Sequence, residues 1–200
     1  MSKLPNARRV LTMVPKHEPI DLSRAGAGNF KRTRRKFVEA LWILVEFLLV
    51  SNPLQVSSGV RAWTLRMFGA RIGANVLLRP RLRVKFPWNL QVGDNCWLGE
   101  GVWIHNQGLV TIEDNAIVSQ EAFITTGSHD IYSTMDLIVE PVAIRRGAWI
   151  TTRCIVLQGV EVGENTVVTP GSVVQKSLPA EGIYGGNPAK FVRQRWKAQT

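Results

Sequence analysis

Residues 144–174 read I RRGAWI TTRCIV LQGVEV GENTVV TPGSVV, with Ile or Val at every sixth position. The same series extends back to Ile72, and all fifteen of its anchor positions hold Ile, Leu or Val. Helices repeat every 3.6 residues and half-buried strands every two, so neither explains this period alone. A chain that turns a corner every six residues around an apolar axis does explain it. We therefore expect an all-β fold, a parallel β-helix over residues 72–178.

The interruptions of the period show where the chain leaves the solenoid. Three anchors make one coil of eighteen residues, and the fifteen anchors group into five coils. Extra residues occur only between coils, after Val84, Ile104 and Ile124, so every insertion leaves from the same corner of a three-sided prism. Successive coils stack about 4.8 Å apart. Asn106 and His129, which belong to two of these insertions, should therefore lie close together along one edge.

The positive charge is concentrated near the N-terminus. The formal net charge is +10, and residues 1–36 hold ten Lys or Arg against two acidic residues. The solenoid is therefore nearly neutral, and we do not expect it to bind nucleic acid. Cys96 and Cys154 both occupy inward-facing small positions of the repeat, which indicates core residues rather than a disulfide or a metal pair. This pattern favours a reduced, cytoplasmic protein.

The sequence divides into four segments. Residues 1–36 have no apolar period and are expected to form a basic flexible tail. Residues 37–71 hold an apolar helix and an amphipathic helix. Residues 72–178 form the solenoid, with a long loop at 126–141. Residues 179–200 are expected to form a turn and a short C-terminal helix, because Asn187 and Pro188 suit the N-cap and the first helical position.

Two roles fit the helices of residues 37–71. The apolar run 37–50 is shorter than the roughly 20 residues that span a bilayer. We favour a cap over the first coil, since the ends of a solenoid need covering. The alternative is a peripheral contact of residues 1–50 with the inner face of the membrane, helped by the basic tail. The second helix should pack through an apolar face that excludes Arg61 and consists of Val60, Trp63, Thr64, Met67 and Phe68.

The residue before each anchor should point outward, because neighbours on a strand alternate. On two faces of the prism these outward columns are apolar at nine of ten positions. The columns are Leu77, Trp97, Ile117, Trp149 and Val167 on one face, and Arg83, Trp103, Phe123, Ile155 and Val173 on the next. A monomer would not leave such columns in water. We therefore expect other subunits to cover them, and a closed ring is the economical arrangement for a three-sided prism.

The loop Thr126-Gly127-Ser128-His129-Asp130 is the best candidate for chemistry. A neutral imidazole can take a proton from a hydroxyl group as that hydroxyl attacks an acyl carbon, so His129 is our candidate general base. Asp130 could orient its ring, although a backbone carbonyl would serve as well. Asn106 could hold the acceptor or the developing oxyanion. His105 points outward at the same corner and ranks second as the base.

Several motifs together resemble a known family. They are the hexapeptide series, the loop 126–130, Gly147-Ala148-Trp149-Ile150, and the tail Gly186-Asn187-Pro188-Ala189-Lys190. Over residues 37–195 the chain resembles the hexapeptide-repeat O-acetyltransferases, most of all the branch associated with colanic acid and related exopolysaccharide biosynthesis. Arg79-Pro80-Arg81 and Lys85-Phe86-Pro87-Trp88 also look like that branch.

The resemblance implies a left-handed β-helix, a trimer, and acetyl-coenzyme A bound between neighbouring prisms, with no metal. It assigns the role of general base to His129 and places Asn106 near the acceptor. It also implies a set of coenzyme-binding residues, which maps onto Trp149, Thr152, Lys176, Lys190 and Arg193. The acceptor would be a sugar hydroxyl of a glycan, and the sequence leaves open whether that glycan is lipid-linked.

Three alternatives compete with an O-acetyltransferase. The acceptor could be an amino sugar, which would make the enzyme an N-acetyltransferase. The chain could be a β-helical scaffold without catalysis, which would bind no coenzyme. A metal enzyme similar to the γ-class carbonic anhydrases needs three His at a subunit junction, and outside the tail the chain has only His105 and His129.

Overall fold

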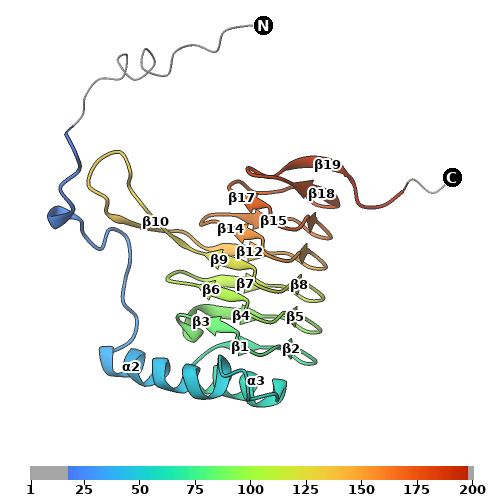
Figure 1. Ribbon diagram of the computed structural model, residues 1–200, viewed down its shortest axis with the longest axis horizontal. Helices are drawn as coiled ribbons and strands as arrows, with labels where there is room; N and C mark the ends of the chain where they lie inside the picture. Colours follow the sequence, from blue (N-terminus) through green and yellow to red (C-terminus); the bar gives the residue numbers. More distant parts are fainter. Residues whose placement is uncertain (1–17, 198–200) are drawn as a thin grey trace, which may run out of the picture.

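The computed structural model describes residues 18–197 and shows a three-sided prism of stacked coils with helices at one end (Figure 1). Its three faces are parallel sheets. Sheet A contains β1 (Arg71–Ile72), β4 (Leu90–Val92), β7 (Val110–Ile112), β12 (Val142–Ile144) and β15 (Glu161–Val162). Sheet B contains β2 (Leu77–Leu78), β5 (Trp97–Leu98), β8 (Ile117–Val118), β13 (Trp149–Ile150), β16 (Val167–Val168), β18 (Gly182–Gly185) and β19 (Lys190–Gln194). Sheet C contains β3 (Arg83–Val84), β6 (Trp103–His105), β9 (Phe123–Thr125), β14 (Ile155–Val156) and β17 (Val173–Val174).

The anchor residues form the core of the prism. Each is at most 8% exposed, and they stack in register from coil to coil, as in the pairs Ile72 with Val92 and Ile144 with Val162. Cys96 and Cys154 are buried free thiols. The prediction of a parallel β-helix is therefore confirmed. The number of coils differs slightly, because β18 adds part of a sixth coil to the five expected.

One residue in each corner between sheets A and B has a left-handed backbone conformation, which few residue types adopt readily. At the corner between sheets A and B, one residue per coil has φ between 54° and 66°: Asn75, Asn95, Asn115, Gly147 and Asn165. Glycine adopts this left-handed region freely, and asparagine adopts it more readily than most residues. The chain can therefore turn from one face of the prism onto the next within a few residues.

The helices close the first coil at its open edge. Helix α2 (Lys36–Val45) continues into a π-helical turn, η2 (Glu46–Val50), and α3 (Ser58–Met67) follows after a loop. One polar side chain from these helices bonds to each edge strand: Arg66 to the carbonyl of Ile72 on β1, Ser58 to the N–H of Leu78 on β2, and Glu46 to the N–H of Val84 on β3. These bonds satisfy backbone groups that an uncovered edge would expose.

The expected packing face of α3 is right for Thr64, which is buried, and for Phe68, which packs against the core, and wrong for its other members. Val60, Trp63 and Met67 are exposed, whereas Arg61 is fully buried, as are Ala62 and Leu65. The Arg61 guanidinium donates to the carbonyls of Val50, Asn52 and Gln55 and so holds the loop between the two helices. These hydrogen bonds allow a charged side chain to occupy the inner face of the helix.

The expected C-terminal helix is also wrong. Residues 190–194 form strand β19, which pairs antiparallel with β18 at the end of sheet B. An unpaired sheet edge offers a full row of backbone partners, and β-formers such as Phe191 and Val192 suit it. The tertiary context therefore overrides the helix signal of Asn187 and Pro188.

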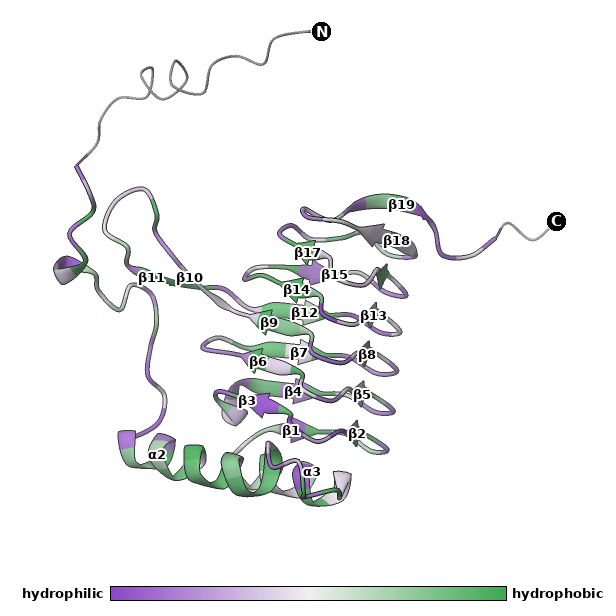
Figure 2. Cartoon of the chain, in the orientation of Figure 1, coloured by the Kyte–Doolittle hydropathy of each residue, from purple (hydrophilic) through white to green (hydrophobic). Residues whose placement is uncertain are grey.

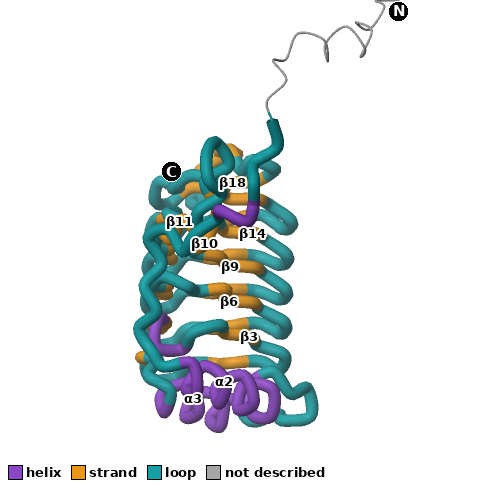
Figure 3. The backbone as a smooth tube through the Cα atoms, turned by 90° about the vertical axis from the view of Figure 1, so that its left-hand side faces the viewer, coloured by secondary structure: helices purple, strands orange, loops and turns teal. Residues whose placement is uncertain are grey.

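The described part of the basic tail is docked rather than loose. Residues 18–35, the N-terminal arm, contain a short 3-10 turn, η1 (Leu22–Arg24), and run along the side of the prism to the long insertion (Figure 3). Gly26 N–H donates to Asp136 Oδ1 at 2.6 Å, and the Asn29 side chain bonds to both backbone groups of Val139. Residues 1–17, the rest of the predicted tail, lie outside the described residues.

Candidate active site

All the long connections leave the prism at the corner between sheets C and A, as the spacing predicted. They are residues 85–89, which include the 3-10 turn η3 (Pro87–Asn89), residues 106–109, and the long insertion. Thr126 holds the last two together, since its N–H donates to the carbonyl of His105 and its Oγ1 accepts from the N–H of Gly108. The corner is therefore one bonded unit rather than three separate loops.

The long insertion is a β-hairpin. Strand β10 (Gly127–His129) pairs antiparallel with β11 (Leu137–Val139), and His129 lies opposite Leu137. The His129 side chain is exposed, and its Nδ1 lies 2.8 Å from the carbonyl oxygen of Met135. A carbonyl oxygen can only accept, so Nδ1 carries the proton and Nε2 of the neutral ring keeps its lone pair free. This is the tautomer that a general base requires.

Asp130 does not orient the imidazole. Its carboxylate accepts from the hydroxyl of Ser133 and, at 3.0 Å, from the N–H of Tyr132. These two hydrogen bonds lower the pKa of Asp130, the bond from the Ser133 side chain most of all. The carboxylate therefore shapes the hairpin tip, and the backbone carbonyl of Met135 takes the orienting role.

Asn106 lies at the expected corner, but its side chain points inward and is fully buried. Its Oδ1 accepts from the N–H of Phe86 at 3.0 Å, and its Nδ2 donates to the carbonyls of Phe86 and Asn89 at 2.7 and 3.0 Å. The amide is fully used in holding the loop 85–89. This geometry does not support a direct contact with the acceptor, so we correct the expected role of Asn106 to a structural one.

His105 is half-buried on the outer face of sheet C. Lys85 Nζ lies 3.0 Å from its Nε2, and an ammonium group can only donate, so Nε2 is the acceptor. Burial, and then the charge of Lys85, lower the pKa of His105. The lone pair of this ring is therefore already occupied, and His105 is a poorer candidate base than His129.

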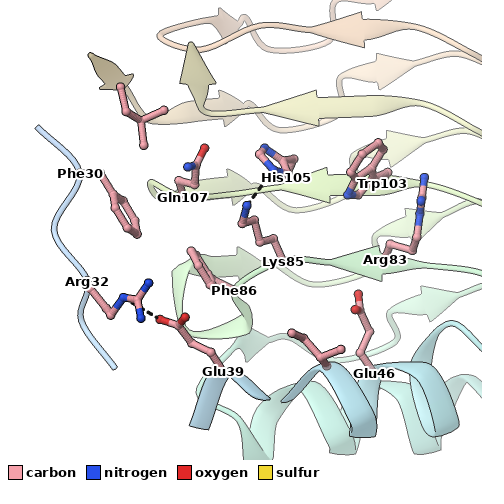
Figure 4. Close-up of a pocket in the computed structure, with 12 residues that line it drawn as sticks. Phe30, Arg32, Glu39, Glu46, Arg83, Lys85, Phe86, Trp103, His105 and Gln107 are labelled. Atoms are coloured by element: carbon pink, nitrogen blue, oxygen red, sulfur yellow. Dashed lines mark hydrogen bonds and ion pairs between the residues drawn. The ribbon is translucent and has the colours of Figure 1, made fainter. Parts of the chain in front are cut away.

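A cavity of about 630 Å³ lies beside this corner (Figure 4). Aromatic and charged side chains from four regions enclose it. Phe30 and Arg32 come from the N-terminal arm, Glu39 and Glu46 from the helices, Lys85, Phe86, Trp103 and His105 from sheet C and its loops, and Leu137 from the hairpin. Arg83 stacks on the ring of Trp103 at 4.0 Å, and Arg32 lies 3.5 Å from Glu39.

Lys85 and Phe30 line this cavity although neither was expected from the sequence to have a function. The sequence does contain a pattern that could have identified Lys85. The residue after each anchor also points outward, and on sheet C these residues are Lys85, His105 and Thr125. No comparable signal exists for Phe30, because only the folded arm brings its ring against Phe86, with the ring centroids 6.1 Å apart.

Trp149 and Thr152 lie together in a second groove, of about 730 Å³, on sheet B and its following corner. Trp149 Nε1 donates to Ser119 Oγ at 2.9 Å, and Thr152 Oγ1 donates to Gln120 Oε1 at 3.2 Å. Trp97 forms part of the same wall and is 55% exposed. The groove is largely apolar, with a few polar side chains at its edge, which is typical of small-molecule sites.

Two of the expected basic residues lie on the same face as this groove. Trp149 is in register with Val167, Ile183 and then Arg193 on successive strands of sheet B, and Lys190 is at the start of β19. Lys176 follows β17 and lies instead at the corner between sheets C and A. The structure of one chain therefore brings Trp149 and Thr152 together, aligns Arg193 with them, and leaves Lys176 apart. Among residues 18–197, no group of three His, Cys, Asp or Glu is arranged to hold a metal ion.

Comparisons with known proteins agree with this architecture. No family model matches the chain. The colanic acid biosynthesis acetyltransferase named WcaF in Escherichia coli is 40% identical over 156 residues, which is 78% of this chain and 86% of that protein. The galactoside O-acetyltransferase of Escherichia coli is 24% identical over 148 residues, 72% of each chain.

Solved structures show the same fold. The hexapeptide-repeat acetyltransferase VCA0836 of Vibrio cholerae, complexed with acetyl-coenzyme A, superposes with a TM-score of 0.75 at 22% identity and covers 88% of this chain and 98% of its own. The galactoside acetyltransferase in complex with coenzyme A gives a TM-score of 0.72 at 21% identity, over 88% of this chain and 92% of its own.

The fold is thus the left-handed parallel β-helix of hexapeptide-repeat acetyltransferases. This chain belongs to that family. Within it, the chain is similar to the colanic acid biosynthesis acetyltransferase WcaF over most of the length of both proteins. The family expected from the sequence motifs is confirmed.

Proposed function

We propose that the enzyme transfers an acetyl group from acetyl-coenzyme A to a sugar hydroxyl during the synthesis of an exopolysaccharide or related glycan, with His129 as the general base. The observation that carries the proposal is the contact of His129 Nδ1 with the Met135 carbonyl, which leaves Nε2 free on an exposed hairpin. The similarity to WcaF and to galactoside O-acetyltransferase supports the choice of donor and acceptor.

The chemistry follows from the free Nε2. It accepts the proton of the sugar hydroxyl while that oxygen forms a bond to the thioester carbonyl carbon. The carbon–sulfur bond then breaks, and the imidazolium returns the proton to the departing thiolate of coenzyme A. No acyl-enzyme is needed, because Cys96 and Cys154 are buried inside the prism and cannot reach the thioester.

Acetyl-coenzyme A would lie along the groove of sheet B. Trp149 and Thr152 would line the path of its extended arm, and Lys190 and Arg193 on β19 would meet its phosphates. Arg193 is three strands from Trp149, or about 14 Å at the usual strand spacing. Lys176 lies on another corner, so it could serve the same coenzyme only from a neighbouring chain. That requirement supports a homotrimer, as do the exposed rings of Trp97 and Trp149.

The acceptor would occupy the cavity of about 630 Å³ beside the hairpin. The rings of Phe86 and Trp103 offer apolar faces on which a sugar ring can stack, while Lys85 and Gln107 offer hydrogen-bond donors. Leu137, which pairs with His129 across the hairpin, forms part of the cavity wall. The cavity and the base thus share one structural element.

The proposal is tested by incubating the full-length protein with acetyl-coenzyme A and a panel of free and lipid-linked glycans, with the released thiol and the acetylated product measured. We expect an ester that mild alkali removes. An alkali-stable amide would indicate an amino sugar acceptor instead. Isothermal titration with acetyl-coenzyme A should show binding, and the absence of binding heat would indicate a scaffold and overturn the proposal.

A further inference from the structure

The helical end of the prism carries a large apolar surface that no described residue covers. Every exposed residue from Phe37 to Leu48 is apolar, and most of α2 has the green colour of hydrophobic residues in Figure 2. The loop and α3 continue this surface. We call it the helical base, and its members are Phe37, Leu41, Leu44, Phe47, Leu48, Leu54, Val56, Val60, Trp63 and Met67, each at least 38% exposed. Soluble proteins seldom expose an apolar area of this extent unless it binds something.

The acidic side chains of α2 and η2 point away from the helical base. Glu39 faces the cavity and lies 3.5 Å from the guanidinium of Arg32. Glu46 is largely enclosed and accepts from the N–H of Val84. The two carboxylates of α2 and η2 therefore point toward the prism, and the outer face of these helices is free of negative charge.

The charge of the whole chain is strongly polarised along the prism. Residues 31–93, which form the helices, the first coil and the chain next to them, hold twelve Lys or Arg and only two acidic residues. Residues 94–200, which form the remaining coils, hold eight Lys or Arg and eleven acidic residues. The run Lys31-Arg32-Thr33-Arg34-Arg35-Lys36 leads into the first residue of α2, and Lys31, Arg34, Arg35 and Lys36 are exposed. These four side chains are the positively charged rim of the base, at the start of α2.

We propose that the helical base docks onto an anionic lipid bilayer. Within residues 18–197 no helix is long and apolar enough to cross a membrane, so the helices would lie in its surface. A second copy packed base to base would also cover the apolar side chains, but it would bring two positive rims together. An anionic bilayer both covers the apolar residues and attracts the rim.

Docking in this way would place the acceptor cavity beside the membrane surface. Ile43, Glu39 and Glu46 of the helices line the cavity directly, so the cavity borders the helices that carry the helical base. On the proposed function, a glycan attached to a lipid carrier in the same bilayer could then enter the cavity from the side. The prism would stand on the membrane with β18 and β19 at its far end (Figure 1).

The test is flotation of the full-length protein with vesicles of phosphatidylcholine alone and of phosphatidylcholine mixed with phosphatidylglycerol. We expect binding to the mixed vesicles that weakens as salt is added. Phe47→Ser and Trp63→Ser each remove an exposed side chain of the helical base and should lower the partition coefficient by about tenfold. Trp196→Ser is the matched control, because Trp196 is similarly exposed at the opposite end of the chain and should not affect binding.

Coenzyme binding by each variant, measured in parallel, reports the integrity of the fold and keeps this test separate from that of the proposed function. Absence of binding to the mixed vesicles would overturn the docking proposal, and so would equal losses in Trp63→Ser and Trp196→Ser. A lipid-free assembly whose mass is halved by Phe47→Ser, without vesicle binding, would assign the helical base to a second copy.

Discussion

Replacing Asn106 with Ala should destabilise the fold without removing a reacting group. The buried amide makes three hydrogen bonds to the backbone of Phe86 and Asn89, at 2.7 to 3.0 Å. Each is worth about 1 kcal/mol net, and stranding the buried Phe86 N–H costs about 1 to 2 kcal/mol more. The free energy of unfolding should therefore fall by about 4 kcal/mol, which corresponds to a loss of about 10 °C in Tm.

The assay is urea unfolding at a fixed protein concentration, together with the acetylation rate per folded molecule well below the new Tm. Asn89→Ala is the matched control at the same corner, because its side chain makes one bond, to the carbonyl of Gln107 at 2.8 Å. It should cost about 1 kcal/mol. If Asn106→Ala kept wild-type stability but lost turnover, the structural role would be refuted and the contact with the acceptor restored.

Three further perturbations test other parts of the molecule. Trp149→Ala removes one wall of the sheet B groove and should weaken coenzyme binding about tenfold by titration; unchanged affinity would place the coenzyme elsewhere. Burial raises the pKa of Glu46 in the folded state. The free energy of unfolding of the wild type should therefore fall as pH rises through that pKa, whereas that of Glu46→Gln should not. Equal pH dependence of the free energy of unfolding in the two proteins would contradict a buried Glu46. Asp136→Ala removes the hydrogen bond that joins the N-terminal arm to the hairpin at Gly26. Hydrogen exchange of the hairpin amides should become faster, and turnover should fall. Exchange at the wild-type rate would show that the arm does not stabilise the hairpin.

The fold could be predicted because its signal is local and repeats without exception. Each anchor reports on its own coil, and one misplaced residue would not have hidden the period. The C-terminal segment could not be predicted in the same way, because its strand partner is fixed by the prism. Asn187 and Pro188 do suit a helix start, but β18, which lies just before them in the sequence, pairs with β16 of the last full coil and offers its other edge to residues 190–194.

The sequence predicted the corner of the prism at which the site lies, but not the directions and contacts of its side chains. Counting the insertions fixed the corner, because topology alone decides which loops stack. The direction of Asn106 was available from strand alternation, since Ile104 points in and His105 out, yet its polarity suggested a surface role. The contacts of Met135 with His129 and of Phe30 with Phe86 depend on the folded hairpin and arm, which no pattern in the sequence specifies.

The most direct test of the central claim compares His129→Ala with His105→Ala in one acetylation assay, with saturating coenzyme and the same acceptor. Loss of the free Nε2 in His129→Ala should slow transfer by about 10² to 10⁴-fold while coenzyme binding is retained. His105→Ala, whose ring already accepts from Lys85, should stay within about tenfold of the wild type. A His129→Ala enzyme that acetylates at the wild-type rate, or a larger loss in His105→Ala, would contradict the assignment of the base.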